Sequence, residues 1–188
     1  LHKSRSAAIP MLTSKVEELL IALGMPNAQL KINLDETKTL TDYGNVTLEF
    51  LFSANKGSSL KPLGKGASGG ELSRVMLALK SVLSNHKHLP TLIFDEIDTG
   101  VSGDIAVKMG AILKQMGDTM QLISITHLPQ IAGQGNAHFK VFKKDTLDKT
   151  QTYIQPLNTQ DRIKEIAGML GGNTESSAAL EHAKNLLN

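Results

Sequence analysis

The first stretch of the chain repeats apolar residues at intervals of three and four positions. On an α-helix these residues form one stripe: Ile9, Leu12, Val16, Leu19, Leu20 and Leu23. Pro10 either kinks this helix or marks its first turn. Gly24 and Pro26 are typical of a helix end. The pattern therefore predicts an amphipathic helix that ends at Gly24.

After this helix the pattern changes to strict alternation. Three apolar residues fall on one face of an extended segment: Leu30, Ile32 and Leu34. A turn at Gly44-Asn45 and a second strand from Val46 to Phe52 are expected next. The stretch SSLKPLGKGASGG, residues 58–70, then predicts a long flexible loop.

The middle of the chain predicts a strand, a helix and a second strand. Residues 89–96, LPTLIFDE, form an apolar run that ends in acids, which is typical of a strand buried on both faces. Ser102 is placed to cap a helix that Gly117 ends. Residues 121–127, QLISITH, predict a second buried strand. Such a βαβ unit predicts a parallel sheet with a right-handed crossover.

Helices flank this unit, and a hairpin follows it. The helix before it, directly after two glycines, has apolar residues at helical spacing: Leu72, Val75, Met76, Leu79, Val82 and Leu83. Residues 138–145 and 151–157 suggest a hairpin. Residues 159–172 and 175–187 predict two more helices.

Composition narrows the class of protein. The chain has 188 residues, 40% hydrophobic and 20% charged, as expected for one soluble globular domain with a core. A net charge of +2 does not by itself indicate a nucleic-acid binder. The absence of cysteine excludes disulfides and thiolate zinc sites. Without an apolar run of membrane-spanning length, and without a signal-peptide core, we expect a cytoplasmic protein. Leu1 in place of Met suggests a fragment.

Ser68, Gly69, Gly70 and Glu71 stand directly before a predicted helix. A helix N-terminus offers unpaired N–H groups and a partial positive charge. Glycines let the backbone approach a phosphate closely, and the serine hydroxyl adds a donor. The motif therefore indicates a phosphate site. An ordinary helix cap built from Ser68 or Glu71 is an equally strong interpretation.

Asp95 and Glu96 follow the first buried strand, and His127 follows the second. Ligands of open parallel sheets bind at this carboxyl edge. One acid suits Mg²⁺, which takes few protein ligands, and the other suits a water that must be oriented or deprotonated. His127 is a candidate contact for a terminal phosphate on the same edge. The alternative is that these are solvated strand ends.

The order of these motifs resembles the C-terminal lobe of an ABC-type ATPase head. Residues 68–71 resemble the signature motif, Asp95 and Glu96 the Walker B pair, Asp98 the D-loop, and His127 the switch histidine. The closer resemblance is to the RecN family of SMC-like bacterial DNA-repair ATPases. It rests on ASGGELSRVMLALK, TLIFDEIDTGVSG and ITHLPQIA, and it extends over essentially the whole chain from Leu12 onward.

The resemblance implies an α/β fold. It consists of a parallel sheet core with flanking helices, an antiparallel strand pair and the end of a coiled-coil helix. Residues 1–24 would be the end of the returning coiled-coil helix, and residues 25–188 the C-terminal lobe of the head. No G-x-x-x-x-G-K-[ST] phosphate loop occurs in the chain. In this family that Walker A loop lies in an N-terminal lobe, on the far side of a long coiled coil.

The resemblance also implies cofactors, roles and partners. The cofactors are ATP and Mg²⁺: Asp95 would hold the metal through its water shell, Glu96 would polarise the attacking water, and His127 would contact the γ-phosphate. Residues 68–71 would close over ATP held by a second head, and Asp98 would couple the two sites. The partners would be the Walker A lobe, a second head in a homodimer, and DNA through the full-length protein, with no membrane contact. The implied function is repair of DNA double-strand breaks by a cytoplasmic, nucleoid-associated ATPase.

Two other interpretations remain open at this point. The chain could be half of another SMC-like or transporter-type ATPase, although DEIDTGVSG is not the typical transporter sequence after the Walker B acids. It could also be an interaction domain that has lost turnover, although Glu96 and His127 are both present. On every interpretation we expect the isolated chain to be inactive, because it has no Walker A loop.

Overall fold

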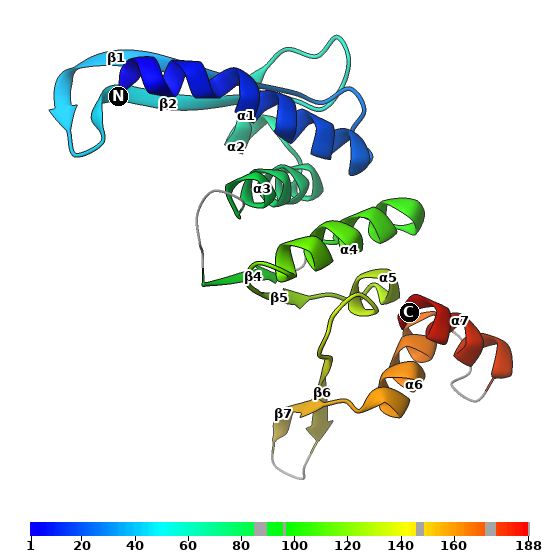
Figure 1. The fold of residues 1–188 in the computed structure, drawn as a ribbon. Helices are drawn as coiled ribbons and strands as arrows, with labels where there is room; N and C mark the ends of the chain where they lie inside the picture. The colour runs from blue at the N-terminus through cyan, green and yellow to red at the C-terminus, as the bar shows by residue number, and fades with distance from the viewer. Residues whose placement is uncertain (85–89, 96, 146–148, 172–175, 188) are drawn as a thin grey trace.

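The computed structural model describes residues 1–84, 90–95, 97–145, 149–171 and 176–187. Its elements succeed one another along an elongated molecule, from α1 and the first hairpin at one end to α6 and α7 at the other (Figure 1). In chain order they are α1 His2–Ala22, β1 Gln29–Thr41, β2 Gly44–Ser53, β3 Lys61–Pro62, α2 Leu63–Gly66, α3 Gly69–Ser84, β4 Thr91–Asp95, α4 Gly103–Gly117, β5 Gln121–Ile125, α5 Pro129–Ala132, β6 Phe139–Asp145, β7 Thr150–Pro156, α6 Thr159–Met169 and α7 Ser177–Leu187. The predicted α/β class is confirmed.

Helix α1 is anchored through its second half. Val16 and Leu20, together with Leu23 directly after the helix, are fully buried in the main core, whereas most of the first half is exposed. Pro10 lies inside the helix rather than in its first turn. Gly24 ends the helix as predicted: its φ is +79°, and a Cβ there would lie 2.4 Å from the Ile105 side chain.

The strands β1 and β2 form a long antiparallel hairpin beside α1 (Figure 1). The predicted turn position is wrong by a few residues, because Thr41 pairs with Gly44 and the turn is Asp42-Tyr43. The side chain of Thr41 explains this position. Its hydroxyl donates to the Gly44 carbonyl at 2.8 Å and accepts from the Tyr43 N–H at 3.2 Å.

The segment predicted as one long loop is partly ordered. β3 pairs with β2, Phe52 with Lys61, and α2 follows directly. Leu63 packs against the main core. A Cβ on Gly66 would lie 2.9 Å from the Lys61 Cβ, so only a glycine allows the chain to double back so closely. The many glycine, serine and proline residues of this stretch are typical of loops, so the sequence did not predict β3 and α2.

The predicted strand–helix–strand unit is confirmed. β4 and β5 are parallel, with Ile93 opposite Ile123, and α4 connects them. Ser102 is the N-cap residue of α4, but its side chain makes no cap hydrogen bond. Gly117 is the last residue of that helix, as expected.

The prediction that these strands are buried on both faces is wrong for this chain. Leu92 and Phe94 are buried, but Ile93 is 64% exposed and Ile123 is 44% exposed. The helices of the main core cover one face of the pair. In the described part of the chain, β4 and β5 form a sheet of two strands whose other face is open.

The C-terminal elements form a second, smaller core. β6 and β7 pair as the predicted hairpin. Helices α6 and α7 bury Ile166, Ala167 and Ala183 between them. The predictions of this hairpin and of both helices are confirmed.

Arg162 of α6 connects this core to the segment after α5. Its guanidinium donates to the main-chain carbonyls of Gly133, Gly135 and Asn136. His138 lies nearby, and burial together with the positive charge of Arg162 lowers its pKa below the usual 6.5. The charge of Glu165 opposes this shift, and that of Lys140 adds to it.

The lowered pKa of His138 predicts a loss of stability in acid. The unfolded chain binds a proton at His138 at a higher pH than the folded chain does. Unfolding is therefore favoured increasingly as the pH falls through about 6.5. We expect His138→Gln to lose less stability than the wild type between about pH 8 and about pH 5.5, measured by urea denaturation. His182→Gln, at an exposed position of α7, is the control. If His138→Gln kept the full wild-type pH dependence, another group would be responsible.

Candidate functional site

Helix α3 begins with a capping box. Glu71 Oε2 accepts from the Ser68 N–H at 2.7 Å and from the Ser68 hydroxyl at 2.9 Å. Ser68 Oγ is in turn 3.4 Å from the Glu71 backbone nitrogen, which donates to it. This is the Ser-x-x-Glu arrangement expected from the sequence. Within the described residues, the hydrogen bonds of Ser68 all go to Glu71 and Leu72 of its own helix.

The two glycines of this motif differ in their surroundings. A Cβ on Gly70 would lie 2.9 Å from the Thr99 carbonyl oxygen, so a glycine is needed for the helix to pack there. A Cβ on Gly69 would meet no atom within 4 Å, and Gly69 is exposed. The close contact at Gly70 places the start of α3 against the turn that contains Asp98.

The acids after β4 occupy contrasting environments. Asp95 is the last residue of the strand, exposed, and paired in register with Ile125. It alternates with Leu92 and Phe94, so it belongs to the open face of the sheet, as Ile93 does. Glu96 lies outside the described residues. Asp98, two positions further on, is fully buried.

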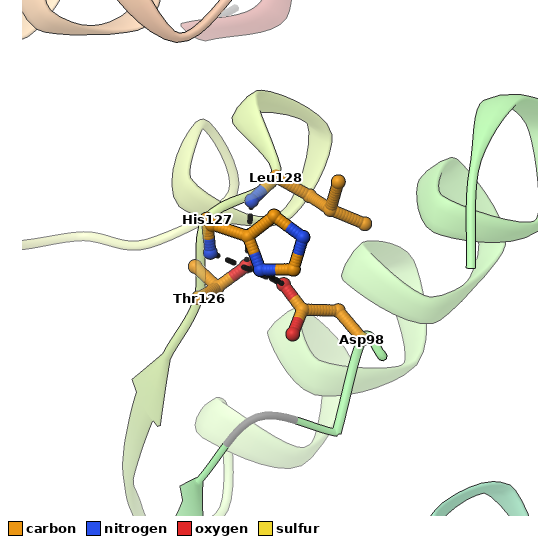
Figure 2. Close-up of polar contacts among 4 residues, drawn as sticks. All are labelled: Asp98, Thr126, His127 and Leu128. Carbon is orange, nitrogen blue, oxygen red and sulfur yellow. Dashed lines mark hydrogen bonds and ion pairs between the residues drawn. The ribbon is translucent and has the colours of Figure 1, made fainter. Parts of the chain in front are cut away.

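Asp98, Thr126 and His127 meet where β4 and β5 end (Figure 2). Asp98 Oδ2 accepts from the Thr126 hydroxyl and from the His127 N–H, at 3.2 Å from that nitrogen. The ring atom His127 Nδ1 lies 3.4 Å from the same oxygen. The Thr126 oxygen accepts from the Leu128 N–H at 3.0 Å. The structure thus brings Asp98 and His127 together through Thr126, a residue that the sequence analysis did not single out.

This arrangement gives His127 one inward and one outward nitrogen. The side chain of His127 is 71% exposed, while that of Asp98 is 0% exposed. With Nδ1 facing the buried carboxylate, Nε2 is the nitrogen directed away from it (Figure 2). The ring can therefore donate to, or accept from, a group outside the fold. The other oxygen of Asp98, Oδ1, is buried and has no hydrogen-bond partner in the described part of the chain.

The described residues fit a nucleotide site only in part. Ser68 offers an N–H and a hydroxyl, with open space at Gly69, although Glu71 now accepts from both donors. Asp95 offers one exposed carboxylate, which is compatible with a Mg²⁺ ion that keeps most of its waters. No group of three or more His, Cys, Asp or Glu side chains suited to a metal occurs among the described residues. The chain has no Walker A loop to hold the phosphates.

None of the described helices is both long enough and apolar enough to span a membrane.

Comparison with curated proteins identifies relatives over the whole chain, although no protein-family model matches it. The DNA repair protein RecN of Vibrio cholerae is 38% identical over 188 residues, and that of Treponema pallidum 42% identical over 193 residues. RecN of Deinococcus radiodurans is 40% identical over 187 residues. Each alignment covers 100% of this chain but only 33% to 34% of the relative. The chain therefore spans about a third of the length of these proteins.

Solved structures that share the fold include a head domain of an Smc protein and a chain from work on SMC ATPases. The Smc head domain with a coiled coil and joint from Pyrococcus yayanosii matches with a TM-score of 0.66 at 20% identity, over 88% of this chain and 30% of that one. A structure from work on ATP-driven dimerization and DNA-stimulated activation of SMC ATPases matches with a TM-score of 0.59 at 17% identity, over 90% of this chain and 98% of that one. At such identities these matches show the fold alone. The resemblance predicted from the motifs is nevertheless confirmed: this chain is homologous, over its whole length, to about a third of the DNA repair protein RecN, and it has the fold of an SMC head.

Proposed function

We propose that this chain is the C-terminal half of a RecN-like ATPase head that acts in recombinational repair of DNA double-strand breaks. In this proposal it supplies the signature motif, the Walker B acids and the switch histidine to composite ATP sites in a head dimer. The observation that carries it is the 38% to 42% identity to RecN proteins along the entire chain, which includes all three motifs. The parent protein would act on DNA in the cytoplasm, associated with the nucleoid.

The positions of Asp95 and His127 support distinct roles for these two residues, whereas the role proposed for Glu96 rests on its motif alone. Asp95, exposed at the end of β4, would hold Mg²⁺ through its water shell. Glu96 would orient and deprotonate the attacking water. His127 would contact the γ-phosphate with Nε2, the nitrogen that faces away from Asp98. Such chemistry depends on positioning and on charge stabilisation, because phosphoryl transfer needs little covalent participation by the protein.

The start of α3 would serve the ATP of a second head. Ser68 and Gly69 are exposed, as a surface that closes over a partner's phosphate requires. The N–H and hydroxyl of Ser68 would donate to that phosphate, and the partial positive charge of the helix would favour it. Glu71 would first have to release both donors.

The missing lobe would cover the open face of the parallel strands. Ile93, Ile123 and Ile125 are exposed side chains on β4 and β5, and large apolar side chains gathered on one sheet face indicate an interface. Because the chain spans only a third of its relatives, the rest of the same protein is the partner that this face best fits. The Walker A lobe would then place the phosphates of its bound ATP beside Asp95, which lies on the same face of the sheet.

We expect the isolated chain to bind ATP weakly and not to hydrolyse it. It has no phosphate loop whose N–H groups and lysine would hold the nucleotide. Calorimetric titration and a phosphate-release assay with Mg²⁺ measure both properties. Glu96→Gln is the control for contaminating activity. Turnover by the wild-type chain that disappears in Glu96→Gln would show that the chain is sufficient for hydrolysis.

In the full-length protein, Ser68→Arg should abolish hydrolysis but leave nucleotide binding intact. A long cation would fill the space meant for the phosphate of the other head, whereas binding to the Walker A lobe does not involve Ser68. Ser68→Ala separates this effect from the lost helix cap, which is worth about 1 kcal/mol. Ser6→Arg, at an exposed position of α1, controls for the added charge. Loss of ATP binding in Ser68→Arg, with Ser6→Arg unaffected, would contradict the role in a second head's site.

Glu96→Gln and Asp95→Asn should separate the two acids of the full-length protein. Glu96→Gln cannot take a proton from water, so turnover should fall by about 10²–10⁴ while binding persists and ATP-bound dimers accumulate. Asp95→Asn should weaken nucleotide retention as well as turnover, because it acts on the metal. Size-exclusion chromatography with ATP and Mg²⁺ should show a stable dimer for Glu96→Gln and mostly monomer for Asp95→Asn. Identical elution profiles would refute the assignment.

A further inference from the structure

We infer that Thr126, held by the buried carboxylate of Asp98, is a positioning residue that fixes the direction and the tautomer of His127. The inference deepens the proposed function, because it rests on the role proposed there for His127. It also assigns Asp98 an action within its own chain, through the Thr126-His127 segment, since its side chain is fully buried there.

The hydroxyl of Thr126 both donates and accepts a hydrogen bond. It has a single proton, which it donates to Asp98 Oδ2. Its oxygen accepts from the Leu128 N–H at 3.0 Å. Residue 127 lies between these two connections, and its own N–H also donates to Asp98 Oδ2. The backbone on both sides of His127 is therefore tied to one buried carboxylate (Figure 2).

The same oxygen determines which ring nitrogen carries the proton. Asp98 Oδ2 already accepts from a hydroxyl and from a backbone N–H, so it acts as an acceptor at this point. Nδ1 of His127 lies 3.4 Å from it, and a lone pair there would face the lone pairs of an acceptor. In this proposal the contact, an ion-pair distance rather than a hydrogen bond, favours the neutral ring that is protonated on Nδ1. Its Nε2 is left as an acceptor, and becomes an outward donor when the ring takes up a second proton.

This contact also fixes His127 relative to the other motifs. Asp98 follows β4, Thr126 and His127 follow β5, and the two strands are parallel neighbours. The Thr99 carbonyl, beside Asp98, lies so near the start of α3 that a Cβ on Gly70 would be 2.9 Å from its oxygen. A shift of Asp98 would thus move the histidine relative to Asp95 and to the signature motif. In this proposal the contact with Asp98 sets the distances from the His127 ring to Asp95 and to the signature motif, because the exposed ring has no other polar anchor among the residues that the structure describes.

Nitrogen NMR of the histidine ring tests the inference without any nucleotide. In the 188-residue chain labelled with ¹⁵N-histidine, at about pH 8 where an ordinary histidine is neutral, we expect Nδ1 of His127 to carry the proton. Thr126→Val keeps the side-chain shape but loses the hydroxyl, so the other tautomer should become populated. Thr126→Ser should restore the wild-type spectrum. Thr91→Val removes a hydroxyl bond to Gln121 at the opposite end of the same strands and should leave His127 unchanged.

Kinetics of the full-length protein give a second measurement. Thr126→Val should lower kcat about tenfold to a hundredfold with little change in KM, because a misplacement of about 1 Å can lower a rate about 10²-fold. Thr126→Ser and Thr91→Val should stay near the wild type. If Thr126→Val does not fold, the wild-type spectrum still decides: a neutral ring protonated on Nε2 overturns the inference. So does an unchanged His127 tautomer in folded Thr126→Val.

The two proposals fail separately. If His127→Ala retained full ATPase activity while the NMR results held, the role of His127 in turnover would be wrong and its positioning would stand. If His127→Ala abolished turnover while Thr126→Val altered neither tautomer nor kcat, the proposed function would stand and the positioning role of Thr126 would be wrong.

Discussion

The buried carboxylate of Asp98 is the contact on which the geometry of the candidate site depends. A carboxylate removed from water needs partners, and here one oxygen takes them from the segment after the neighbouring strand. These contacts connect the end of β4 to the end of β5 in addition to the hydrogen bonds between the two strands. The close contact between Gly70 and Thr99 extends the same connection to α3. Three segments that are far apart in the sequence thereby acquire fixed relative positions.

The open face of the parallel sheet is the observation that best fits the proposal that another part of a longer protein covers it. Parallel strands normally lie between layers on both faces, because their side chains are apolar on both sides. Here Leu92 and Phe94 face the core, while Ile93 and Ile123 face outward at 64% and 44% exposure. The outward-facing isoleucines of this apolar run are the side chains that a second layer would bury. The chain spans about a third of the length of its relatives, and in the proposal above the rest of the protein would supply the second layer.

Much of the fold follows from periodicity, and the exceptions have physical causes. The helices, the βαβ unit and the C-terminal hairpin were predictable because each has a regular apolar pattern. Burial on both faces of β4 was not correctly predicted, because the pattern cannot tell which layers this chain contains. The turn after β1 was misplaced because the Thr41 side chain, rather than Gly44, sets it. In the site, Asp98 and His127 could be predicted from their motifs. Thr126 was missed because its importance lies in a contact with a residue far along the chain, although a hydroxyl residue between a buried strand and a candidate histidine is a usable signal.

The way α1 enters the core has a mechanical consequence. Val16 and Leu20 of its second half, and Leu23 directly after it, have no exposed surface, and they belong to the same core as Val75 and Leu77 of α3. Turning this helix about its axis by a single residue, about 100°, would remove Val16 and Leu20 from the core and bring a charged neighbour of Val16, Lys15 or Glu17, toward it. The packing of these side chains in the core therefore opposes rotation of helix α1 about its axis. Helix α3, whose first turn contains Gly69 and Gly70, shares this core with α1, so a rotation of α1 would also disturb the packing of α3.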